Sequence, residues 1–216
     1  MKLKKGDFIE IDYVGKIREE DKIFDLTDEK LARENKIYNE DHKYKPVIIC
    51  LGYNDIIPGL DEELINKELG KYKIEIKSEK AFGKKTYELI KLVPNSVFNN
   101  ENIKPFSGLQ VNIEGLIGII RSVSGGRSLV DFNHPLSGKN LVYDVDIKRI
   151  VVDLNEKLSS LLELKLGKEI KFEIIGSKLE IKFDLDKKLQ EQLTQEIKSK
   201  VNEIKEVEFK KTTTKE

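Results

Sequence analysis

The charges of this 216-residue chain balance, with 39 Lys and Arg against 39 Asp and Glu, and the chain has one cysteine and no tryptophan. A net charge of zero favours neither nucleic acid nor a membrane surface as a partner, and a single cysteine excludes an internal disulfide. No apolar run approaches the roughly 20 residues of a membrane-spanning helix, and the first residues lack the apolar stretch of a signal peptide. We therefore expect a soluble cytoplasmic protein, with the sparse Cys and Met and abundant Lys and Glu that are typical of thermophiles.

The N-terminal part of the chain predicts several short strands. Side chains in two of the segments alternate between apolar and polar, which is the pattern of a strand with one buried face. The predicted strands cover residues 6–15, 22–25, 47–51 and 72–76.

Helix is predicted only sparsely in this part. The strongly charged residues 27–44 indicate a loop with one helical turn, for which Thr27 and Asp28 supply an N-cap. A second helix is expected to start near Pro58, because proline is tolerated in a first turn, and to end at Gly70. Its apolar side consists of Leu60, Leu64 and Ile65.

A long strand is predicted from residue 141 to 147. Leu141, Tyr143, Val145 and Ile147 share one face, and Asp144 and Asp146 lie on the other. The preceding residues 135–138 have turn chemistry. Considered alone, Tyr143 could be an ordinary core residue or part of a site.

Residues 84–133 predict a small β-rich segment of about 50 residues. Strands are expected at 110–113, 115–123 and 128–132, with Gly125-Gly126 as a hairpin turn. Apolar side chains fall on both faces of residues 116–120, and so small a domain cannot bury both faces completely.

The pattern changes again after residue 153. A leucine-rich helix is expected, capped by Asn155 and ended by Gly167, followed by a hairpin over 170–183. Next comes an amphipathic helix with the apolar stripe Leu189, Leu193, Ile197, Val201 and Ile204. Residues 207–209 predict a last strand. A unit of this size often needs a partner, so we expect a homodimer through it, although packing within one chain is nearly as compatible with the pattern.

Four short motifs follow one another along the chain. They are Ile23-Phe24-Asp25, the stretch from Leu51-Gly52 to Ile57-Pro58-Gly59-Leu60, Ala81-Phe82-Gly83, and Leu141-Val142-Tyr143-Asp144 preceded by Asn133-His134-Pro135-Leu136. In this order the chain resembles the SlyD-like FKBP-type peptidyl-prolyl cis-trans isomerases with an insert-in-flap domain, in their long archaeal form. The resemblance implies an α+β fold, in which an antiparallel sheet wraps on a short helix and carries an inserted small β domain and a C-terminal α/β unit. The implied divisions are 1–83 plus 134–152 for the isomerase domain, 84–133 for the insert, 153–210 for the C-terminal domain and 211–216 for a disordered tail.

The resemblance also implies a site. Its catalytic residues are Tyr13, Phe24, Asp25, Ile57, Phe82 and Tyr143, and substrate contacts come from Val47, Ile56, Leu60, Ile117 and Ile119. Tyr143 forms the floor, Asp25 is the polar member, and the Ile57 backbone N–H holds a substrate carbonyl. Such a pocket needs no metal or cofactor, because a twisted X–Pro amide is less polar than a planar one and an apolar cavity favours it.

Two positions depart from the family pattern. Leu60 stands where eukaryotic members have Trp, as in other SlyD-like members, and Phe82 lacks the hydroxyl of the usual Tyr. Losing one hydrogen bond of this kind costs about 1 kcal/mol of binding, so we expect activity to survive with weaker inhibitor binding.

Other classes of function are disfavoured. His42 lies in a charged loop, His134 has a structural role, and Cys50 is expected to be a buried small hydrophobe. The tail 210–216 has no His or Cys, so the metal-binding tail of some SlyD proteins is absent. A translation-associated β-barrel protein is disfavoured by the balanced charge.

The predicted function is a prolyl isomerase and folding chaperone acting on unfolded or proline-containing polypeptides. The alternative is a non-catalytic holdase or adaptor on the same scaffold. Ile117 and Ile119 either bind unfolded chains or fill the core of the insert.

Overall fold

The computed structural model describes residues 1–100 and 102–210. The chain divides into two compact units. We call Met1–Ile76 together with the chain from Leu141 onward the core unit, and Lys77–Asn140 the insert unit. The predicted insert, 84–133, lies inside the insert unit, and the predicted C-terminal domain lies in the core unit. The three-domain division stays a prediction, and the predicted disordered tail lies outside the described residues.

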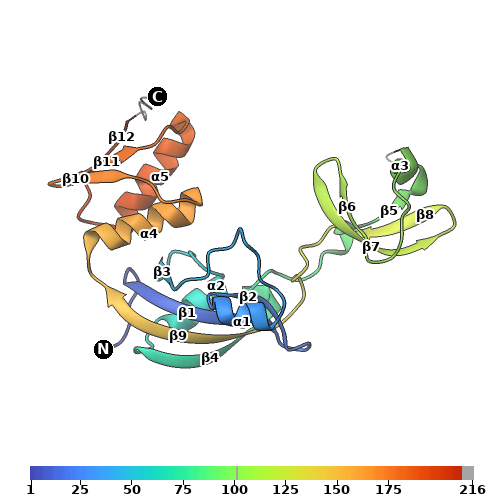
Figure 1. Cartoon of the computed structure of the whole chain (residues 1–216), viewed down its shortest axis with the longest axis horizontal. Coiled ribbons are helices and arrows are strands. Elements are labelled where there is room, and N and C mark those ends of the chain that lie inside the picture. The colour runs from blue at the N-terminus through green and yellow to red at the C-terminus, as the bar shows by residue number, and fades with distance from the viewer. Residues whose placement is uncertain (101, 211–216) are drawn as a thin grey trace. The chain divides into compact units, whose positions relative to one another are not determined.

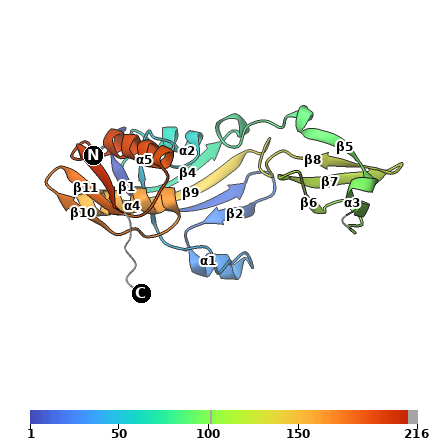
Figure 2. The same ribbon diagram turned by 90° about the horizontal axis from the view of Figure 1, so that it is seen from above.

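The core unit is built on a five-stranded antiparallel sheet. Its strands are β1 (Phe8–Ile17), β2 (Lys22–Leu26), β3 (Val47–Cys50), β4 (Gly70–Ile76) and β9 (Leu141–Val151). The order is β2-β1-β9-β4. The edge of β1 away from β9 pairs with two strands in turn: its first half with β3 and its second half with β2. Figure 2 shows β9 running between β1 and β4. The predicted antiparallel sheet is confirmed.

The alternation of side chains explains why β9 lies inside this sheet. Leu141, Tyr143, Val145 and Ile147 are all buried on one face, while Asp144 is exposed on the other. The short helix α2 (Pro58–Leu64) buries Leu60 and Leu64 and packs against β4. A second short helix, α1 (Glu29–Glu34), is capped by the Asp28 carboxylate, which accepts a hydrogen bond from Leu31 N–H.

The predicted end of the second helix at Gly70 is wrong. The helix ends at Leu64, because Ile65 is extended and Asn66 has a φ of 68°. Asn66 N–H then donates to the Leu3 carbonyl at 2.9 Å, and Leu3 N–H donates to the Lys67 carbonyl at 2.8 Å. Pairing with the N-terminal segment replaces the next helical turn, and Gly70 opens β4.

The insert unit is a four-stranded antiparallel sheet of order β5-β8-β7-β6 with one helix. Its strands are β5 (Ile90–Pro94), β6 (Gln110–Ile113), β7 (Leu116–Ser124) and β8 (Arg127–Asp131), its helix is α3 (Asn95–Asn100), and single 3-10 turns lie at Ser78–Lys80 and Tyr87–Leu89. Phe98, Val111, Ile120 and Val130 form its core. The Gly125-Gly126 turn joins β7 to β8 with both residues at positive φ, as predicted. The strand β5 was not predicted because it ends in a proline, which argues against a strand, and the helix α3 was not predicted because six residues are too few to show a helical period.

The C-terminal part of the core unit contains two helices and a three-stranded sheet (Figure 1). The elements are α4 (Leu154–Leu166), β10 (Phe172–Ile175), β11 (Lys178–Lys182), α5 (Lys187–Lys200) and β12 (Glu206–Lys210), with β12 parallel to β11. Gly167 ends α4 in the left-handed conformation, as predicted. The predicted N-cap Asn155 is wrong, because Asp153 caps the helix by accepting from Glu156 N–H at 2.9 Å.

Most of the apolar stripe on α5 and after it is covered within the chain. Leu193, Ile197, Val201 and Ile204 are buried in one cluster with Phe8, Cys50 and Val151, whereas Leu189 is exposed. The C-terminal helices therefore share a hydrophobic core with β1, β3 and β9. Among the described helices, none is both long and apolar enough to cross a membrane.

Candidate active site

Three of the predicted aromatic residues lie together on neighbouring strands. The Tyr143 ring on β9 lies 5.8 Å from the Tyr13 ring on β1, at 59°, and 5.8 Å from the Phe24 ring on β2, edge-on at 87°. Gly15 is opposite Asp25 in one strand pair and opposite Tyr143 in the other. A Cβ on Gly15 would lie 2.9 Å from Phe24 Cζ and 3.0 Å from Tyr143 Cε1, so the absence of a side chain there lets the rings approach.

Asp25 gives this cluster its polar group. The Tyr13 hydroxyl donates a hydrogen bond to Asp25 Oδ2 at 2.9 Å. Burial, and then the charge of Asp25, raises the pKa of Tyr13 above its ordinary value, and the same two causes raise the pKa of Tyr143. Both hydroxyls therefore stay protonated at neutral pH and remain donors.

The connection from β3 to α2 carries the predicted backbone donor. Ile56 and Ile57 are half-buried, and the Ile57 carbonyl accepts from Leu60 N–H and Asp61 N–H at the start of α2. Within the described residues, the Ile57 N–H has no hydrogen-bond partner, as a substrate-binding donor requires. The Asp61 carboxylate fixes the loop by accepting from Gly52 N–H at 2.8 Å and Asn54 N–H at 2.9 Å.

Two other predicted contact residues differ in exposure. Leu60 is almost completely buried in the core, and Val47 is half-buried at the start of β3. Leu60 can therefore support a pocket from behind but offers very little surface to a ligand.

Phe82 belongs to the insert unit. Its ring stacks on the His134 ring, with centroids 4.4 Å apart and planes 4° from parallel. The Ser137 hydroxyl donates to the Phe82 carbonyl at 3.0 Å, and Leu136 N–H donates to His134 Nδ1 at 3.2 Å. The turn over 134–137 thus orients Phe82, and the place of Phe82 in the site stays a prediction.

Residues of the β2–β3 connection were missed as site residues. A cavity of about 230 Å³ lies beside Phe24 and Asp25, and its other walls include Ile37, Asn39, His42 and Tyr44. The His42 and Tyr44 rings lie 4.6 Å apart, so His42 is an exposed member of an aromatic group. The signal in the sequence was the gathering of Tyr38, His42 and Tyr44 in an otherwise charged stretch.

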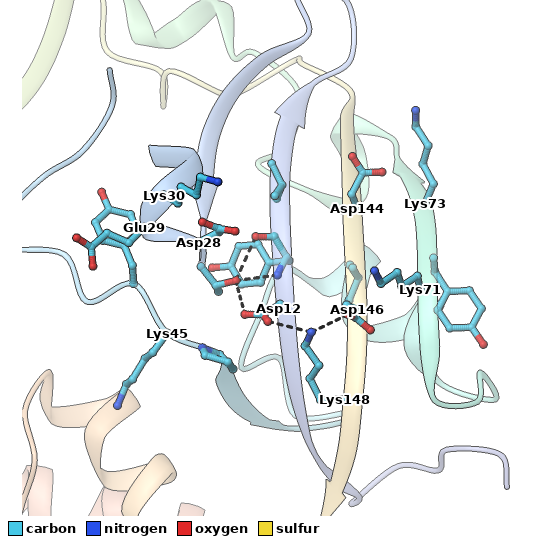
Figure 3. A pocket seen from close by; sticks show the side chains of 17 residues that line it. Asp12, Asp28, Glu29, Lys30, Lys45, Lys71, Lys73, Asp144, Asp146 and Lys148 are labelled. Carbon is cyan, nitrogen blue, oxygen red and sulfur yellow. Dashed lines mark hydrogen bonds and ion pairs between the residues drawn. The ribbon is translucent and has the colours of Figure 1, made fainter. Parts of the chain in front are cut away.

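A second cavity of the core unit has different chemistry. It measures about 790 Å³ and lies over β1, β9 and β4, next to α1 (Figure 3). Five acidic and five lysine side chains line it, and Lys148 bridges Asp12 at 3.2 Å and Asp146 at 2.7 Å. Tyr13 of the aromatic cluster also lines this cavity, together with uncharged side chains such as Val14, Pro46 and Val145.

The two predicted residues of the insert lie on β7, outside the core of that unit. Gly118 and Ile120 are buried, whereas Ile117 is 60% exposed and Ile119 is half-buried. Leu116, at 57% exposure, adjoins Ile117. Ile117 and Ile119 therefore give apolar surface to the face of β7 opposite the core, and Leu116 adds an exposed apolar side chain at the start of the strand, on the other face.

Cys50 has no catalytic role in this arrangement. It is fully buried, and burial followed by the charge of Asp55 raises the pKa of its thiol to about 12. The prediction of a buried small hydrophobe is confirmed. Residues 1–100 and 102–210 contain no group of three or more His, Cys, Asp or Glu that could hold a metal ion.

Comparison with known proteins agrees with this fold. A family model described as "FKBP26, IF domain" matches residues 91–136. The chain is 31% identical over 149 residues to the short-type peptidyl-prolyl cis-trans isomerase of Methanocaldococcus jannaschii, an alignment that covers 68% of this chain and 94% of the relative. It is 26% identical over 152 residues to the FKBP-type peptidyl-prolyl cis-trans isomerase SlyD of Haemophilus influenzae, covering 68% of this chain and 72% of the relative.

An antiparallel sheet on a short helix, with a small inserted domain, is the fold of the FKBP-type prolyl isomerases, and the chain belongs to that family of enzymes. Within the family it is a SlyD-like member that carries an insert-in-flap domain.

Proposed function

We propose that this enzyme isomerises X–Pro bonds of unfolded or proline-containing polypeptides at the cluster of Tyr13, Phe24, Asp25 and Tyr143. The observation that carries the proposal is the pair of ring contacts to Tyr143 together with the Tyr13–Asp25 hydrogen bond. Proline-containing chains are the substrates that the names of the related isomerases imply.

The mechanism follows from the chemistry of the amide. Rotation of an X–Pro bond meets a barrier of about 18–20 kcal/mol, because the planar form is stabilised by resonance. The twisted form is less polar, so aromatic walls favour it over the hydrated planar form. The Ile57 N–H would hold a substrate carbonyl, and Val47 and Ile56 would contact the substrate.

The test is catalysis of a proline-limited refolding reaction. The purified chain should accelerate refolding, whereas Asp25→Ala and Tyr143→Ala should lower kcat/KM by about tenfold or more, as expected when one hydrogen bond to a charge or one aromatic contact is lost. Circular dichroism on each variant controls for folding. A folded wild-type chain that leaves the refolding rate unchanged would establish the alternative, a non-catalytic holdase or adaptor.

We also propose that the insert unit holds unfolded chains through Leu116, Ile117 and Ile119, because exposed apolar patches typically mark binding surfaces. Changing Leu116 and Ile117 together to Ser should preserve turnover of a proline tetrapeptide and weaken turnover of a refolding protein severalfold. Val123→Ser, on the same strand but apart from Leu116 and Ile117 along it, is the matched control. Equal losses on both substrates would contradict this division of labour.

The C-terminal helices are proposed to assist in holding clients. The predicted homodimer through this unit also stays a hypothesis, and among the stripe residues only Leu189 remains exposed to form such an interface. We further propose that the protein acts in the cytoplasm, and its archaeal and thermophilic origin stays a prediction.

A further inference from the structure

One loop carries the predicted substrate-binding residues Ile56 and Ile57, and another lines the cavity beside Phe24 and Asp25. A helix of the C-terminal segment is bonded to each of these loops. We propose that Lys200 on α5 and Glu163 on α4 are positioning residues for the isomerase, so that the segment after Val152 sets the affinity of the site for its substrate. This inference rests on the proposed location of the site.

The first loop joins β3 to α2 and leads directly into Ile56 and Ile57. Lys200, the last residue of α5, has a side chain only 1% exposed, and its Nζ lies 2.5 Å from Asp55 Oδ1 and 2.6 Å from Glu196 Oε1. Asp55 Oδ2 accepts from Cys50 N–H at 3.0 Å, so one carboxylate ties the loop both to α5 and to the end of β3. The Tyr53 hydroxyl adds a second tie by donating to the Ser199 carbonyl at 2.7 Å.

Lys200 stays charged in its ion pair with Asp55. Burial opposes a charge on Lys200, but hydrogen bonds to Asp55 and Glu196 outweigh it and raise the pKa of the ammonium group. A buried pair of this kind contributes more to fixing one geometry than to overall stability, because desolvation offsets much of the attraction. The residue that it fixes, Asp55, is the direct neighbour of the proposed substrate-binding pair Ile56 and Ile57.

The second loop joins β2 to β3 and forms the outer wall of the cavity beside Phe24 and Asp25. Glu163 on α4 accepts from Lys43 Nζ at 2.9 Å and from Lys45 Nζ at 2.7 Å. Tyr44, between these two lysines, lines the cavity with Phe24 and Asp25 and accepts from Asn39 N–H at 3.0 Å. One carboxylate thus holds the chain on both sides of Tyr44.

These contacts lie away from the aromatic cluster, so they would act on binding and not on the twisting step. A loop that is already ordered before substrate arrives has less conformational entropy to lose on binding. Loss of either tie should therefore raise KM and leave kcat close to its original value.

The experiment measures kcat and KM for a proline tetrapeptide with the full chain. We expect Lys200→Met and Glu163→Ala each to raise KM by about fivefold, the order expected when a few loop side chains must be ordered on binding. Lys200→Arg, which can still pair with Asp55, should restore KM to within about twofold of wild type. The control is Lys182→Ala, which removes an ion pair with Glu173 on the C-terminal hairpin and touches neither loop.

The outcomes separate this inference from the proposed function. Suppose that wild type is active and that Tyr143→Ala loses about tenfold or more of kcat/KM. If Glu163→Ala and Lys200→Met then keep the wild-type KM, the positioning role is overturned and the site stands. If Lys200→Met fails to fold, the KM of Glu163→Ala alone tests the inference. The lysine partners of Glu163 are largely exposed, so this substitution leaves the hydrophobic core intact. A fall in kcat at constant KM, or an equal effect of Lys182→Ala, would also overturn the inference. A wild-type chain without turnover would contradict the proposed function itself.

Discussion

At the scale of single residues, Gly15 decides the geometry of the aromatic cluster. It lies toward the end of β1 at a negative φ, so its backbone conformation is open to any residue, and only space excludes a larger side chain. The nearest atoms belong to Phe24 and Tyr143, both proposed members of the site. A motif-based analysis recognises the two aromatics but has no reason to single out the glycine between them.

Gly15→Ala should impair catalysis more than stability. The added methyl group must displace the Phe24 and Tyr143 rings, and overpacking of this kind costs about 1–3 kcal/mol. We expect kcat/KM for a proline tetrapeptide to fall about tenfold, with a loss of a few degrees in Tm. Val14→Ala, the neighbour on the same strand, is the control, and equal activity of the two variants would show that the rings have room to move.

At the scale of elements, Asp131 at the end of β8 organises the base of the insert unit. Its side chain is 2% exposed and accepts hydrogen bonds from Arg121 on β7 at 2.8 Å, from Lys85 at 3.2 Å and from the Asn133 side chain at 2.8 Å. Burial opposes its ionisation, but the hydrogen bonds from Asn133, Arg121 and Lys85 outweigh burial and hold its pKa well below the ordinary range. Asn133 in turn accepts from Thr86 N–H at 2.8 Å, which joins the two connecting segments of the unit.

The stability of the insert unit should depend on this carboxylate in acid. Because the folded-state pKa is lowered, the contribution of Asp131 is fully present above the unfolded-state pKa of about 3.9 and is lost as pH falls through the lower folded-state value. Asp131→Asn should destabilise the unit by about 1–3 kcal/mol at pH 7 and flatten the loss of stability below about pH 4. Amide hydrogen exchange of β7 and β8 in the full chain measures this, with Asp144→Asn, an exposed carboxylate of the core unit, as control. An unchanged exchange rate in Asp131→Asn would remove Asp131 from this role.

At the scale of the whole molecule, the C-terminal segment is part of the core unit's hydrophobic core. Phe8, Cys50 and Val151 belong to the same buried cluster as Leu158, Leu162 and Ile197. The isomerase sheet therefore offers an apolar surface that α4 and α5 cover.

Truncation after Val152 should expose that surface. Uncovering a large apolar side chain costs about 1.5–3 kcal/mol, so a chain ending at Val152 should lose several degrees of Tm and bind a hydrophobic dye that the full chain does not bind. Light scattering on both chains also tests the homodimer, which requires a dimeric full chain and a monomeric truncation. A truncated chain with the Tm of the full chain would show that the sheet does not need this cover.

The sequence alone determined most of the strands, the turn at Gly125-Gly126 and the family, because each depends on residues close together in the chain. The alternation of Leu141, Tyr143, Val145 and Ile147 gave β9 its buried face, and the four motifs pointed to the aromatic cluster that the structure brings together. The tertiary structure alone decided that Asn66 leaves the helix to pair with Leu3, that β3 and β2 share one edge of β1, and that Lys200 reaches Asp55, 145 residues away. Periodicity describes which face of an element is apolar, but it cannot say which other element covers that face, because this depends on packing between segments far apart in sequence.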